Sequence, residues 1–129
     1  MEKKILVTND AFKGCNGSDL IYKNEYLSFT YSSAVREIVV DKKCFWILDF
    51  INSYQKSFFN EGFQSWTLKR VLDLNDKGEV SVRSDSFIIF CDNGNDVELC
   101  KKVIHFSDYP DDELKLWVVN NVLILPEEY

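Results

Sequence analysis

Several residue types that mark special classes of protein are scarce in this chain of 129 residues. Two prolines and five glycines are too few for a collagen-like repeat, and they argue against a disordered chain. No run of eighteen apolar residues occurs, so we expect no transmembrane helix and no membrane binding. The first residues also lack the apolar core of a signal peptide, which predicts a cytoplasmic protein.

Residues that bind metals are few and widely spaced. The four cysteines, Cys15, Cys44, Cys91 and Cys100, are separated by 29, 47 and 9 residues, and none forms a CxxC pair. A structural zinc site needs four nitrogen or sulfur ligands at close spacing, and the chain has a single histidine, His105. We therefore expect no metal, no other cofactor and reduced thiols.

Sequence patterns of catalytic sites are missing as well. The chain has no phosphate-binding P-loop, no G-x-G-x-x-G pattern and no G-x-S-x-G nucleophile elbow. These absences predict that the chain is not an enzyme and has no catalytic residues. An enzyme that uses His105 with Asp108 or Cys91 stays open as an alternative, because histidine is the commonest general base.

Arginine is scarce, and the acids outnumber the bases by 21 to 15. Nucleic-acid binding depends on Lys and Arg side chains that neutralise phosphates, so we expect no direct DNA or RNA ligand. The excess acid lies at the end of the chain, because residues 106–129 carry a net charge of −5 and residues 1–105 only −1. We infer an acidic docking surface for a protein partner. Its candidate residues are Asp108, Asp111, Asp112, Glu113, Glu127, Glu128, Tyr129 and Trp117.

Aromatic side chains are plentiful, at 15% of the residues, and they predict a well-anchored core. Apolar residues recur at helical spacing over residues 33–41 and 44–57, and Ser32 or Ser33 suits the N-cap of the first helix. Residues 18–31 fit neither the helical nor the strand period. A short helix and an extended segment therefore both stay open for that stretch.

Apolar and polar residues alternate as in strands in the second half of the chain. The turn sequences at residues 75–78 and 120–121 are typical of hairpins. We predict a single α+β domain over residues 1–129, with a helical half at about 18–60 and a stranded half at about 62–129. The N-terminal helices are expected to pack on one face of an antiparallel β-meander. The expected strands are 63–74, 79–83, 86–91, 97–104, 114–119 and 122–125.

Four stretches resemble a family of uncharacterised small proteins from phages, plasmids and other mobile genetic elements. Residues 45–51 (FWILDFI) are similar to its W-L-L-D-x-I pattern, and residues 63–68 (FQSWTL) to its F-x-x-W-x-L pattern. Residues 106–110 (FSDYP) resemble T-D-F-P, and residues 123–129 (LILPEEY) resemble the closing L-L-L-P-x-E-Y. The resemblance supplies no activity and no site residues. It implies an accessory protein of a mobile element in the cytoplasm of a host cell.

That context favours one class of function. Small acidic phage proteins resemble, in kind, the anti-CRISPR inhibitors of host defence. We therefore expect a non-enzymatic protein that binds and inhibits a CRISPR effector or another nucleic-acid-handling complex with a basic surface. The alternative is a structural homo-oligomer, a homodimer included, that pairs through an exposed edge strand.

Overall fold

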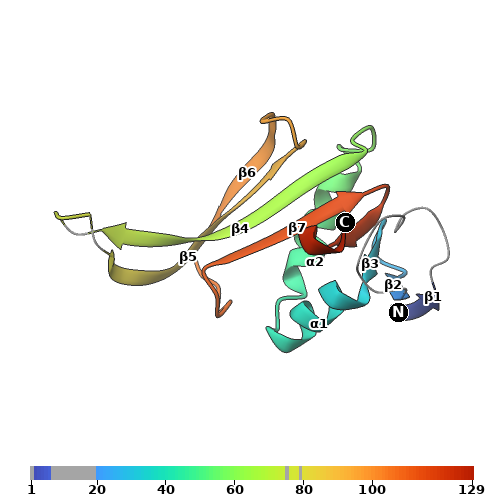
Figure 1. Cartoon of the computed structure of the whole chain (residues 1–129), viewed down its shortest axis with the longest axis horizontal. Helices are drawn as coiled ribbons and strands as arrows, with labels where there is room; N and C mark the ends of the chain where they lie inside the picture. The colour runs from blue at the N-terminus through green and yellow to red at the C-terminus, as the bar shows by residue number, and fades with distance from the viewer. Residues whose placement is uncertain (1, 7–19, 75, 79) are drawn as a thin grey trace.

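The computed structural model describes residues 2–6, 20–74, 76–78 and 80–129 (Figure 1). These residues form two α-helices and an eight-stranded, mostly antiparallel sheet, so the α+β class is confirmed. Neither described helix has the length and apolar character needed to cross a bilayer. The elements are β1 (Glu2–Leu6), β2 (Leu20–Asn24), β3 (Thr30–Ser32), α1 (Ser33–Asp41), α2 (Trp46–Gln55), β4 (Phe63–Leu74), β5 (Val80–Asp92), β6 (Glu98–Ile104), β7 (Glu113–Val119), β8 (Val122–Ile124) and the 3₁₀ turn η2 (Pro126–Glu128).

The two helices lie close to where the sequence pattern predicts them. Ser32 is the N-cap of α1, and its hydroxyl oxygen accepts a hydrogen bond from the Val35 N–H at 3.2 Å. The chain leaves α1 through Lys43, whose φ of 53° lies in the left-handed region and stops the helix. The stretch predicted to be ambiguous is extended over Leu20–Asn24, where it forms β2.

The strand order is β1-β2-β3-β8-β7-β4-β5-β6, and this order corrects the predicted meander. The chain does not place β7 beside β6. The chain crosses back after β6, and β7 pairs with the edge of β4 that β5 leaves open. The strands β3 and β8 pair in parallel. Since β3 joins the sheet beside β8, the first half of the chain is not purely helical, which is a second correction.

The β4–β5 hairpin differs from the prediction, and the β7–β8 hairpin agrees with it. The two segments predicted as separate strands around residues 84–85 form one strand, β5, which pairs with β4 through register shifts near Arg70. The long β4–β5 hairpin extends away from the body of the molecule (Figure 1). The turn at Asn120 and Asn121 is confirmed, and both residues have the positive φ values, 50° and 66°, that such a tight hairpin turn requires.

The main core contains side chains from the sheet and from both helices. Trp66 of β4 pairs with Leu116 on one side and Cys91 on the other, so their side chains share this face. These side chains belong to the same buried cluster as those of α1 and α2. The rings of Phe50 and Tyr54 in α2 lie 6.1 and 5.7 Å from that of Trp66.

A pair of amide side chains, the buried Gln64 and the half-buried Gln55, ties α2 to β4. The side chains of Gln55 and Gln64 exchange two hydrogen bonds of 2.8 and 2.9 Å. The Gln64 oxygen also accepts a hydrogen bond from the Trp66 indole N–H at 3.0 Å. Because these polar groups find partners inside the core, burying them costs little, and the network fixes how the helix sits on the strand.

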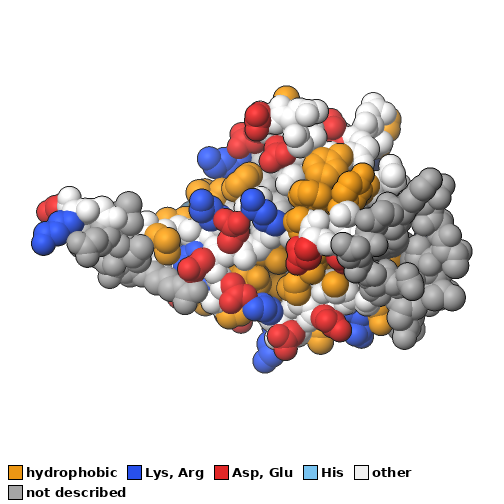
Figure 2. Space-filling model, in the orientation of Figure 1, with side chains coloured by type: hydrophobic (Ala, Val, Ile, Leu, Met, Phe, Trp, Pro, Cys, Tyr) orange, Lys and Arg blue, Asp and Glu red, His pale blue; other side chains and the backbone are white. Residues whose placement is uncertain are grey.

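The opposite face of the sheet carries a smaller buried cluster. It contains Ile21 and the inward residues of the β7–β8 hairpin, with Phe63 and Trp117 packed against it. Figure 2 shows this side of the molecule, where acidic, basic and hydrophobic side chains are interspersed. The described residues of this face therefore form no continuous area of negative charge in this view.

Candidate protein-binding surface

The acidic loop, residues 105–112, is built around one buried cation. The side chain of Arg70 is only 4% exposed, and its guanidinium donates hydrogen bonds to the backbone oxygens of Tyr109 (2.7 Å) and Asp111 (3.2 Å). It also donates to the Ser84 backbone oxygen and to a carboxylate oxygen of Asp112, the latter at 3.0 Å. A planar guanidinium with several donors in a fixed fork is suited to holding such a loop.

Three further contacts fix the loop. The Ser107 N–H donates to the Asp85 backbone oxygen at 2.9 Å, and the Ser107 hydroxyl accepts from the Tyr109 N–H at 3.1 Å. The Tyr109 ring is buried edge-on against Phe87, with 6.1 Å between centroids, and burial raises the pKa of its hydroxyl. Lys42, at the end of α1, forms an ion pair with Asp111. The loop is therefore attached to α1, β4 and β5.

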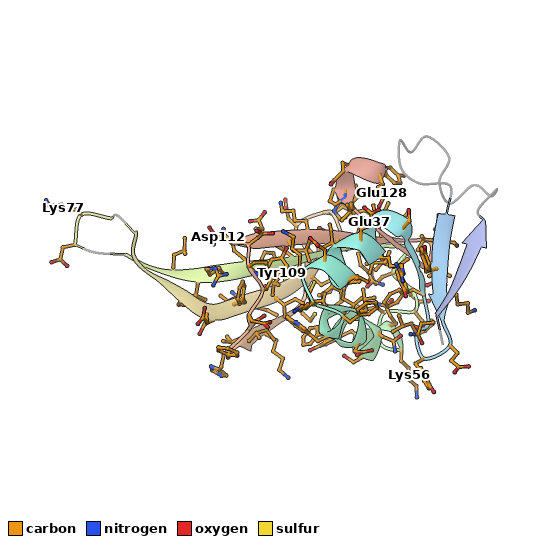
Figure 3. The ribbon with its side chains drawn as sticks, turned by 90° about the horizontal axis from the view of Figure 1, so that it is seen from below. Glu37, Lys56, Lys77, Tyr109, Asp112 and Glu128 are labelled. Atoms are coloured by element: carbon orange, nitrogen blue, oxygen red, sulfur yellow. The ribbon has the colours of Figure 1, made fainter. Side chains whose placement is uncertain are left out.

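The carboxylates of Asp112 in the loop and of Asp85 in β5 are exposed although the loop backbone is fixed. The side chain of Asp112 is 58% exposed and that of Asp85 is 67% exposed, and Asp85 lies 3.6 Å from the Arg70 guanidinium. Figure 3 shows Asp112 and Tyr109 beside the base of the long hairpin. A hollow of about 430 Å³ opens between these groups. It is lined by Arg70, Asp85, Phe106, Asp108, Tyr109 and Pro110.

The charges around this hollow sum to a negative surface. Asp85 and Asp112 pair with the buried guanidinium of Arg70, and Asp108 lines the same hollow. The negative charge of Asp111 is offset by Lys42, because the two side chains form an ion pair. The hydrogen bond between them raises the pKa of Lys42. We define the acidic surface by the three residues Asp85, Asp108 and Asp112. Because Arg70 offsets one of the three carboxylates, a cationic group that approaches this surface meets a net charge of −2.

The structure brings some of the predicted docking residues together and separates others. Asp108, Asp111 and Asp112 lie on the loop, and Glu113 begins β7 beside it, opposite Lys69 of β4. Trp117 lies further along β7 and contacts the ring of Tyr129, with 6.0 Å between centroids. The predicted set therefore divides into an acidic group at the loop and an aromatic group near the C-terminus, where Glu127 is exposed.

Glu128 is a correction to the predicted docking surface. Its side chain is only 3% exposed, so it offers no carboxylate to a partner. One carboxylate oxygen accepts hydrogen bonds from the Ser32 hydroxyl at 2.6 Å and from the Leu125 N–H at 2.9 Å. Since Ser32 caps α1, Glu128 lies at the positive end of that helix (Figure 3). Its role is to hold the C-terminal residues against α1.

Two residues of the acidic site do not stand out in the sequence. Asp85 lies in the gap between the predicted strands 79–83 and 86–91, and Arg70 is one of three scattered arginines. Each joins the loop only through folding, because Arg70 is 42 residues from Asp112. The one available signal is that Arg70 stands in an otherwise alternating strand on the side of the apolar residues Trp66 and Leu68, where a charge needs a partner.

The thiols do not strengthen the alternative of an enzyme. Cys91 is fully buried, and burial raises the pKa of its thiol, whereas the His105 side chain is exposed. Burial likewise raises the pKa of Cys44 to about 11, so neither thiol is a ready nucleophile near neutral pH. Within the part of the chain that the structure describes, no cluster of His, Cys, Asp and Glu could hold a metal ion.

Comparison with known proteins places the chain in a family. Residues 7–129 match the model of DUF6876, a family of unknown function. The chain belongs to the DUF6876 family. No curated protein and no solved structure matches it. The DUF6876 match includes Arg70, the acidic loop and Glu128, and it assigns no activity to any of them, so the function has to be argued from the geometry.

Proposed function

We propose that this DUF6876 protein is a non-enzymatic binding protein whose acidic surface docks on a basic surface of a protein partner. The kind of partner we propose is a nucleic-acid-targeting complex of host defence, such as a CRISPR effector, with the DUF6876 protein as an anti-CRISPR-like inhibitor from a phage or mobile element. We place this binding in the host cytoplasm. We further propose that both helices cover one face of the sheet, which leaves the loop at its end free for the partner.

One observation carries the proposal. Arg70 binds the loop through backbone oxygens, so the loop is held in place while the carboxylates of Asp85 and Asp112 stay more than half exposed. A surface that is ordered before binding loses little conformational entropy when the partner arrives. Carboxylates concentrated on one side of the protein also speed the encounter with a basic partner.

The experiment compares two triple variants that remove the same charge. Asp85→Asn and Asp108→Asn remove two carboxylates of the acidic surface, and Glu113→Gln removes its neighbour at the start of β7, while Asp112 is kept because it pairs with Arg70. The control variant carries Glu37→Gln, Asp49→Asn and Glu98→Gln, three exposed acids on α1, α2 and the far end of β6. Partners are captured from a lysate at low and high salt and identified by mass spectrometry, and their association rates are then measured.

We expect the acidic-surface variant to associate about tenfold more slowly at low salt, because fewer carboxylates steer the partner. The control variant should stay within about twofold of the unchanged chain, and the difference should shrink at high salt as the charges are screened. Equal slowing in both variants would mean that only net charge matters. A captured partner that lacks a basic surface would contradict the proposal.

A second candidate function, the homo-oligomer, is favoured by one feature. Within the described residues, β6 is the last strand of the sheet and pairs only with β5. Its outer edge is open to another strand, and Val103 on it is exposed. The strand also carries Lys101 and Lys102, which are typical of edges that avoid pairing, so we place this function second.

A further inference from the structure

A second hollow lies directly beside the acidic surface, between α2 and the end of β6. Its volume is about 340 Å³. Four of its lining residues are apolar and one is an acid, and they are Trp46, Phe50, Ile104, Phe106, Ser107 and Asp108. Phe106 and Asp108 line the acidic hollow as well. The two hollows therefore meet at these two residues and form one continuous surface.

Phe106 is conspicuous in this surface because its side chain is 71% exposed. It lies two residues beyond the end of β6 and precedes Ser107, whose backbone N–H donates to the Asp85 backbone oxygen. The Phe106 ring is exposed on a fixed backbone, and it lies beside an apolar hollow and near carboxylates. This arrangement resembles the centre of a protein–protein interface. Such centres combine aromatic anchors with a charged rim and lose their water on binding.

We propose that this hollow binds an arginine-containing apolar segment of the protein partner, an inference that rests on the proposed function. An arginine of the partner pairs with the Asp108 carboxylate and stacks on the Phe106 ring. A neighbouring apolar side chain of the partner enters the hollow between Trp46 and Phe50. The inference adds the chemistry of the bound segment to the acidic surface described above.

The chain already uses the same chemistry within its own fold. The guanidinium of Arg70 lies 4.5 Å from the centre of the Phe87 ring while it pairs with Asp112. The guanidinium of Arg36 lies 4.8 Å from the centre of the Tyr22 ring. Such a site favours arginine over lysine, because a guanidinium can stack on a ring and also pair with a carboxylate through two parallel hydrogen bonds.

The charges at the surface select against other occupants. A phosphate backbone would meet the carboxylates of Asp85, Asp108 and Asp112, which repel it. A second copy of the chain is a poor source of the cation, because the described arginine side chains, Arg36 and Arg70, are engaged in their own chain. A partner of different sequence fits the charge and the apolar character together.

The test uses the full chain labelled with ¹⁵N and three synthetic peptides of twelve residues. The first alternates Arg with Leu, the second alternates Arg with Gly, and the third alternates Glu with Leu. The indole N–H signals of the three tryptophans report the position of binding, because Trp46 lines the hollow, whereas Trp66 is buried and Trp117 lies on the other face. The variants are Phe106→Ala and, as a matched control, Phe59→Ala, whose ring is 80% exposed outside this hollow.

We expect the Arg–Leu peptide to shift the Trp46 signal most, to shift that of Trp66 less through its contact with Phe50, and to leave that of Trp117 in place. Phe106→Ala should weaken its binding about tenfold, as expected for an interface anchor, and Phe59→Ala by less than about twofold. If the Arg–Gly peptide binds equally well and Phe106→Ala has no effect, the inference about the hollow is wrong. The proposed docking through the acidic surface would still agree with that result. If the Glu–Leu peptide binds best, or if none binds, both the hollow and the preference for arginine are excluded.

Discussion

Replacing Arg70 with alanine is expected to lower the free energy of unfolding by about 3–5 kcal/mol, the usual cost of removing one member of a buried charged network. The side chain is almost fully buried, and it donates to the backbone oxygens of Ser84, Tyr109 and Asp111. Those oxygens would be left without their donor, and the Asp112 carboxylate would lose its cation. Urea unfolding followed by circular dichroism measures the change.

Two further variants make this result specific to the guanidinium. Lys69→Ala removes a neighbouring charge from the exposed side of the same strand, and it should change stability by less than about 0.5 kcal/mol. Arg70→Lys keeps the charge without the fork of donors, so it should recover only a minor part of the lost stability. If Arg70→Ala unfolds at the same urea concentration as the unchanged chain, the loop is not held as described.

Replacing Glu128 with alanine is expected to cost about 1–3 kcal/mol of stability, because the Ser32 hydroxyl and the Leu125 N–H lose a charged acceptor. Among the described residues, its second carboxylate oxygen has no hydrogen-bond partner, so removing that oxygen recovers part of the cost. Urea unfolding at constant pH measures the difference.

The adjacent glutamate provides a matched control. Glu127 carries the same side chain one residue earlier and is exposed, so Glu127→Ala should change stability by less than about 0.5 kcal/mol. Glu128→Gln keeps one carbonyl oxygen as an acceptor at nearly the same volume, and we expect it to lose less stability than the alanine variant. Equal effects at the two glutamates would contradict the buried role of Glu128.

The parts of the fold that depend on local sequence could be predicted. Ser32 followed by apolar residues at helical spacing locates α1, and Asn120-Asn121 locates the β7–β8 turn. Strand order could not be predicted, because the pairing of β7 with β4 is decided by contacts between segments about 50 residues apart. That β5 is one strand could not be predicted for a different reason, because the polar residues Ser84 and Asp85 separate the strand patterns of residues 79–83 and 86–91.

In the candidate site, too, the sequence predicts the features that lie within one segment but not the contacts between distant segments. The acidity of the loop is visible in the sequence, but the side chains that fix and complete it, Arg70 and Asp85, come from β4 and β5. Glu127 and Glu128 look alike in sequence, as two acids at the end of the chain. The hydrogen bonds from Ser32, 96 residues away, and from the Leu125 N–H distinguish the structural glutamate from the exposed one.

The most direct test of the account is the backbone mobility of the acidic loop, because the central claim is that Arg70 orders it before any partner binds. ¹⁵N relaxation of the free protein gives order parameters for the amides of residues 107–113, Pro110 excepted. The account predicts values of about 0.85, equal to those of the neighbouring strands. Values below about 0.6 across the loop would show that it moves freely, and they would contradict a surface ordered in advance.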